Sequence, residues 1–201
     1  MRITPLNRIF LLVAGLVAAY QVAVGINGLE NVPIIAYTIA FGVLLVAMLL
    51  IIILGIEVLD SPVVVIASTI IPLGLSLGLV WEHIAEWRTP YLVFVISGLL
   101  AVILTRSLPV PGKLAVLVLA LVHGAAGMVV FLLPSILAAQ GITRPGFALV
   151  GLGGSLIGLG GVLLTFLKTS SPIVSRETIL SILPALFMLM SIVFVVGFAL
   201  A

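Results

Sequence analysis

The chain contains the stretch IIAYTIAFGVLLVAMLLIIILGI, Ile34–Ile56, which has 23 consecutive residues and no charged side chain. A transmembrane helix needs about 20 apolar residues. Leu, Ile and Val dominate the stretch without the period-two alternation of a half-buried strand. An open sheet is also excluded in lipid, because no water would satisfy its edge. The stretch therefore predicts a transmembrane helix.

Six further charge-free runs of similar composition accompany this stretch. Together, the seven predicted spans are 9–25, 34–56, 63–81, 90–105, 114–137, 147–167 and 178–200. The connections between them are too short to hold a separate domain, so we expect residues 1–201 to form a single transmembrane helical bundle. The predicted fold is an all-α integral membrane protein, a seven-transmembrane-helix bundle.

The composition of the whole chain supports lipid as the main solvent. Hydrophobic residues make up 64% of the chain and charged residues 7%, whereas soluble domains carry roughly 25% charged residues. This excludes a cytosolic enzyme, a nucleic-acid-binding module and a disordered tail. The absence of cysteine excludes disulfides, thiolate metal sites and cysteine nucleophiles. We expect the lipid bilayer and other membrane protein subunits as partners, and no nucleic acid.

The basic residues predict the orientation of the bundle. With seven spans, one side carries Arg2, Arg8, Arg106, Lys113, Lys168 and Arg176, and the other carries Arg88 and Arg144. Basic residues accumulate on the cytoplasmic side, so we expect a cytoplasmic N-terminus and an external C-terminus. The first span, with basic residues before it, resembles a signal peptide, and we expect an uncleaved signal anchor. The membrane is expected to be a bacterial or archaeal plasma membrane, or a thylakoid-type internal membrane.

A weak internal repeat suggests how the helices are organised. Ser61-Pro62 follows the second span and Ser171-Pro172 follows the sixth, and each following span contains an inner proline, Pro72 or Pro184. This suggests a three-plus-one-plus-three pseudo-repeat with the fourth helix as linker, as in some transporters. The alternative is that Ser-Pro is simply a common helix start, since proline is tolerated in the first turn.

Small residues in the sixth span predict close helix packing. Gly151 and Ser155 are four residues apart, as are Gly154 and Gly158. Small residues at that spacing let another backbone approach closely. We expect the fifth span, with its own patch at 124–127, to be the neighbour. The alternative is a face against which a substrate or partner slides.

His123 is the only ionisable side chain well inside a span. A neutral imidazole there can be an axial ligand to haem or to a chlorophyll-type pigment. It can also donate a hydrogen bond to a carbonyl of a neighbouring helix. Both interpretations stay open, with His123 as the candidate cofactor-binding residue.

The segment after the third span gathers aromatic and polar residues. Trp81, Trp87 and Tyr91 fall at one membrane boundary, where amphipathic rings settle. If the segment is helical, Glu82, His83 and Glu86 share one face. A defined metal site normally needs three or four protein ligands with supporting groups. We therefore predict interfacial anchors and no metal site, with Arg88 in solvent.

The function expected from these features is structural. No ionised side chain lies inside a predicted span, and no catalytic residue set is visible, so we expect no enzyme and no ion-coupled relay. The leading hypothesis is a non-catalytic accessory subunit of a larger membrane complex, respiratory or photosynthetic. One alternative is a small transporter or channel for a neutral solute, along a hydroxyl-lined path. Another is a haem or chlorophyll carrier through His123.

Overall fold

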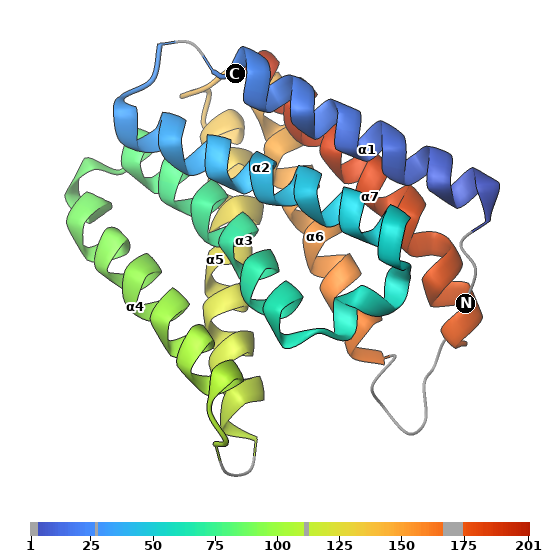
Figure 1. Ribbon diagram of the computed structural model, residues 1–201. Helices are drawn as coiled ribbons and strands as arrows, with labels where there is room; N and C mark the ends of the chain where they lie inside the picture. The colour runs from blue at the N-terminus through green and yellow to red at the C-terminus, as the bar shows by residue number, and fades with distance from the viewer. Residues whose placement is uncertain (1–3, 27, 111–112, 167–174) are drawn as a thin grey trace.

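The computed structural model describes residues 4–26, 28–110, 113–166 and 175–201, which fold into α-helices and short 3-10 helices (Figure 1). The α-helices are α1 (Pro5–Val24), α2 (Asn31–Leu54), α3 (Pro62–His83), α4 (Arg88–Ser107), α5 (Leu114–Ala139), α6 (Ala148–Phe166) and α7 (Arg176–Ala199). The 3-10 helices are η1 (Ile56–Asp60), η2 (Ala85–Trp87) and η3 (Pro145–Phe147). Each predicted span coincides with one α-helix to within a few residues.

The helices have the length and composition of membrane spans. Six of them are long and apolar enough to cross a bilayer. The seventh is the shorter apolar stretch Pro145–Gly161, which consists of η3 and the first part of α6. The predicted seven-helix membrane bundle is therefore confirmed, and the chain is a multi-pass integral membrane protein.

Local capping chemistry sets the helix ends. The side chain of Thr4 accepts a hydrogen bond from the backbone N–H of Asn7, and that of Ser175 accepts one from Thr178, so α1 and α7 begin at polar caps. At the other ends, Gly25 (φ 69°) follows α1 and Gly55 (φ 90°) follows α2. Glycine tolerates such positive φ values without steric cost, which stops both helices.

Six of the helices form a closed ring. In order around the ring, each of α1, α2, α3, α5, α6 and α7 packs against the next, and α7 packs against α1. Helix α4 lies outside the ring, against α3 and α5, and Figure 1 shows it at the opposite side of the bundle from α1. This order of contacts has the three-plus-one-plus-three layout, with α1–α3 and α5–α7 as the two halves.

Aromatic side chains fill the centre of the larger core. Phe41 of α2 lies edge-on to Phe194 and Phe198 of α7, with ring centroids 6.4 and 6.1 Å apart. The ring of Tyr37 lies 4.8 Å from that of Phe198, and Phe147 extends the cluster. These contacts join α2 to α7 across the ring. A separate core cluster joins α3, α4 and α5.

The alternating helices place the polar connections at two ends of the bundle. One end carries Glu30, Arg88 and Arg144, together with the C-terminus, and we call it the Glu30 end. The opposite end carries Arg106 and Lys113, and we call it the Arg106 end. The described basic residues thus separate by end as the sequence predicts, whereas Arg2 and Lys168 lie outside the described residues.

Candidate functional site

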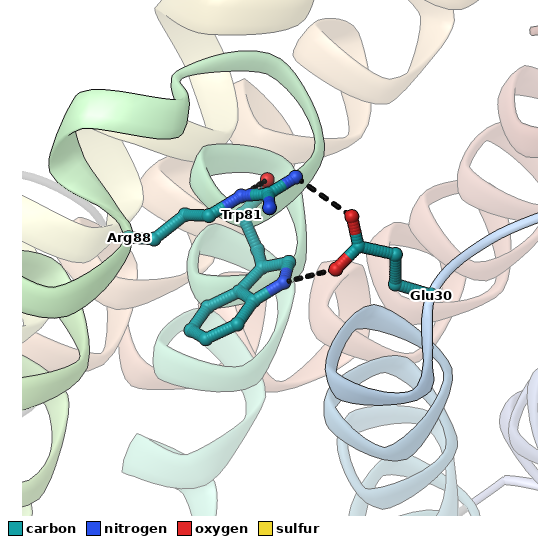
Figure 2. Close-up of polar contacts among 3 residues, drawn as sticks. All are labelled: Glu30, Trp81 and Arg88. Atoms are coloured by element: carbon teal, nitrogen blue, oxygen red, sulfur yellow. Dashed lines mark hydrogen bonds and ion pairs between the residues drawn. The ribbon is translucent and has the colours of Figure 1, made fainter.

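The best-defined polar arrangement is the Glu30 cluster, formed by Glu30, Trp81 and Arg88 (Figure 2). The indole Nε1–H of Trp81 donates to Oε2 of Glu30 at 2.9 Å, and a guanidinium NH2 of Arg88 donates to Oε1 of Glu30, also at 2.9 Å. The Nε–H of Arg88 donates to the backbone carbonyl of Trp81 at 2.7 Å. The three residues come from the start of α2, the end of α3 and the start of α4. The cluster therefore ties three helices together at the Glu30 end.

The electrostatics of the Glu30 cluster favour the ionised pair. The hydrogen bond from Trp81, opposed by partial desolvation and helped by the charge of Arg88, holds the pKa of the Glu30 carboxyl below its usual value. The Arg88 guanidinium carbon also lies 5.5 Å from the centre of the Trp81 ring, a cation–π distance. The sequence predicts a solvated Arg88, and its side chain is 32% exposed, but it is also paired with Glu30. That partner could not be predicted, because Glu30 lies far away in the chain and only folding brings it near.

The residues around the cluster either are exposed or pack against aromatic rings. Trp87 is exposed, and Tyr91 is half-buried with its ring 5.3 Å from that of Phe94. The His83 ring packs 5.3 Å from that of Phe147. Within the described ranges, no three His, Asp or Glu side chains come close enough to hold a metal ion. Trp81, Trp87 and Tyr91 all lie at the Glu30 end of the bundle, as residues at one membrane boundary would. Their interfacial role stays a prediction.

His123 lies on α5, half-buried, with its Nδ1 atom buried and without a hydrogen-bond partner among the residues that the structure places. A Cβ atom added at Gly124 or Gly127 would meet no atom within 4 Å. This part of α5 therefore presents an open face beside the imidazole of His123. The Nδ1 atom is covered by this chain, so a ligand or a neighbouring protein can reach it only after the side chain changes rotamer.

Only some of the small residues that were predicted to form a packing stripe on α6 contact a neighbouring helix. A Cβ at Gly154 would lie 2.8 Å from the backbone nitrogen of Phe131 on α5, and one at Gly151 would lie 2.6 Å from the Phe131 carbonyl oxygen. Gly158 is exposed with open space around it, and Ser155 donates to the Leu152 carbonyl of its own helix at 2.7 Å. Close approach to α5 therefore involves Gly151 and Gly154, and α5 is the neighbour as expected.

A second glycine pair, on α3, was missed in the sequence. A Cβ at Gly74 would lie 2.8 Å from the carbonyl oxygen of Ala36 on α2, and one at Gly78 would collide with the ring of Tyr37. The two glycines have the four-residue spacing of a close helix contact. That spacing was the available signal, but Leu and Ser residues surround it and make the stripe less conspicuous than the one on α6.

Three buried hydroxyl groups that could line a solute path are bonded within their own helices. Thr69, Ser76 and Ser191 are buried, and each donates to a backbone carbonyl three or four residues earlier. Buried Gln21 donates to the Gly25 carbonyl at the end of α1. A cavity of about 10 Å³ beside Gln21 and Thr38 has room for about one water molecule. These groups stabilise helices and leave an apolar interior.

Comparisons of the chain with protein-family models, with curated proteins and with solved structures find no match.

Proposed function

We propose that the protein is a non-catalytic accessory subunit of a larger membrane complex, of respiratory or photosynthetic type. The observation that carries this proposal is the packed apolar interior, in which the buried hydroxyls of Thr69, Ser76 and Ser191 bond within their own helices. A bundle of this kind supplies shape and packing surfaces rather than a solute path. We place it in a bacterial or archaeal plasma membrane, or a thylakoid-type membrane, with the Arg106 end cytoplasmic.

The exposed surface supports an assembly role. Two features of the lipid-facing surface offer more than bulk apolar contact: the open α5 face beside His123, and a groove between α1 and α7 lined by Leu16 and Tyr20.

Purification from the native membrane tests the proposal. The untagged protein is extracted in a mild detergent, and native mass spectrometry identifies the chains that co-purify with it. We expect a defined complex with other membrane proteins that dissociates in a harsher detergent. A single chain that carries lipid alone, recovered at high yield and with a sharp melting transition, would contradict the proposal.

A haem or pigment carrier is the second candidate, and the half-buried imidazole of His123 beside an open stretch of α5 is the observation that favours it. The visible spectrum of the same preparation tests it, with His123→Leu as the matched variant. A Soret or red absorption band that disappears in this variant supports the carrier hypothesis. A spectrum without such a band contradicts it.

A further inference from the structure

The two halves of the ring have equivalent helix contacts. The contact of α1 with α2 corresponds to that of α5 with α6, and the contact of α2 with α3 corresponds to that of α6 with α7. The contact of α3 with α5 then corresponds to that of α7 with α1. If α1, α2 and α3 are matched to α5, α6 and α7, the α3–α5 junction therefore corresponds to the α7–α1 junction.

Among the helices that the structure describes, only α4 covers one of these two junctions. Helix α4 covers α3–α5, where Val102 is completely buried and joins a cluster with Leu73 and Val122. At the equivalent α7–α1 junction the structure has an apolar groove of about 300 Å³. Its lining residues are Val13, Leu16, Val17, Tyr20, Ile192, Val195 and Val196.

The direction of a helix in the groove follows from α4. Helices α3 and α5 both run from the Arg106 end to the Glu30 end, and α4 runs in the opposite direction. Helices α7 and α1 also both run toward the Glu30 end. A helix equivalent to α4 would therefore begin at the Glu30 end and lie antiparallel to α1 and α7.

The charges at the Glu30 end specify the start of such a helix. Glu30 directly precedes α2 and pairs with Arg88, the first residue of α4. Its counterpart in the second half is Arg144, which directly precedes η3 and α6. Arg144 is exposed, and no described acidic residue forms an ion pair with it. The charges are thus reversed, and an acidic residue at the start of an incoming helix would complement Arg144.

A second copy of this chain does not supply that helix in a closed pair. In a parallel dimer through the groove, α1 and α7 of the second copy would approach with the wrong direction. Its α4 has the right direction but lies on the far side of the ring and begins with Arg88, which would repel Arg144. Such head-to-tail contacts also produce open chains or rings rather than a closed pair.

We propose that the α1–α7 groove binds one transmembrane helix of a different protein, antiparallel to α1 and α7, with an acidic residue near Arg144. This inference rests on the proposed accessory role, because it names the surface and the kind of partner through which that role is carried out. The partner helix occupies the position equivalent to α4, so each half of three helices then has one further helix beside it.

Photocrosslinking in the native membrane tests the proposal. A photoreactive phenylalanine analogue is placed at Leu16 in the groove or, as the matched control, at Leu100, which is similarly exposed on α4. Mass spectrometry identifies the crosslinked peptide. We expect position 16 to capture an apolar helix of another protein whose external end carries an acidic residue, and position 100 not to capture it.

Substitutions in the same membranes provide the second measurement. We expect Arg144→Glu to lower recovery of the crosslinked partner about tenfold, because it places like charges together. Lys113→Glu, the same kind of charge reversal at the opposite end, is the matched control and should leave recovery unchanged. Both positions are exposed, so the fold should tolerate the changes.

The outcomes separate this inference from the accessory role. If partner chains co-purify but crosslink only at position 100, the groove inference fails and the accessory role stands. Crosslinks from position 16 to lipid alone, or to a second copy of this chain, also overturn the inference. If no partner co-purifies at all, the accessory role fails with it.

Discussion

Replacing Gly154 by alanine should destabilise the protein, whereas the same change at Gly158 should not. Both residues lie on α6, one helical turn apart. A Cβ at Gly154 would lie 2.8 Å from the backbone nitrogen of Phe131 and 2.9 Å from the carbonyl carbon of Val130. A Cβ at Gly158 would meet nothing within 4 Å. The two variants therefore differ in packing and share the same chemical change.

The expected magnitude follows from two opposing contributions. Alanine favours a helix over glycine by about 1 kcal/mol, and this gain is similar at both positions. Overpacking costs about 1–3 kcal/mol, and the upper part of that range applies at Gly154, because the atoms that block the methyl group are backbone atoms of α5. The two variants should thus differ by roughly 2–3 kcal/mol.

Thermal unfolding in a single mild detergent measures this difference, with the fluorescence of the two tryptophans as the signal. For a chain of this length, the melting temperature of Gly154→Ala should lie about 4–12 °C below that of Gly158→Ala. Gly158→Ala should equal or exceed the unchanged protein. Equal melting temperatures for the two variants would refute the close α5–α6 contact and the packing argument built on it.

Three further predictions concern the Glu30 cluster and His123. Arg88→Lys should lower the melting temperature slightly and change Trp81 emission, because lysine cannot donate to the Trp81 carbonyl and the Glu30 carboxylate as a fork; unchanged emission would contradict the cluster. The pKa of Glu30 lies below its usual value, so the cluster's stabilisation is complete above the usual glutamate pKa and is lost as pH falls through the lowered value. In a Trp87→Phe background, a pH titration of Trp81 emission should show this step, and Glu30→Gln should remove it. His123→Leu should keep or raise the melting temperature if no ligand or partner is bound, because it removes an unpaired buried nitrogen; a marked decrease in the isolated protein would show that the imidazole has a partner.

The helices could be predicted from the sequence because lipid imposes a simple condition on each span. A charge-free run long enough to cross the bilayer must be helical, whatever surrounds it. The helix ends were predicted less accurately, because they depend on single capping residues. Thr4 and Ser175 begin helices several residues before the charge-free runs, and Gly55 ends α2 before its run finishes.

The candidate site was harder to predict because its contacts are non-local. Glu30 lies 58 residues from Arg88 in the chain, and no local pattern pairs them. On α6 the spacing rule identified four small residues, but only the neighbouring helix decides which of them lie at the contact. Gly158 faces open space, while Gly74 on α3 makes a close contact that the spacing alone left inconspicuous.

The difference between closed and open junctions also constrains the partner helix. Where helices of this chain approach most closely, a glycine faces a backbone or a ring, as Gly154 faces α5. The α1–α7 groove instead presents large side chains such as Leu16, Tyr20 and Ile192. Helix α4 meets a comparable surface with a glycine, since a Cβ at Gly98 would lie 3.2 Å from the Val122 side chain. A partner helix that docks as α4 does must therefore supply the small residue itself, near its midpoint and on the face turned toward α1 and α7.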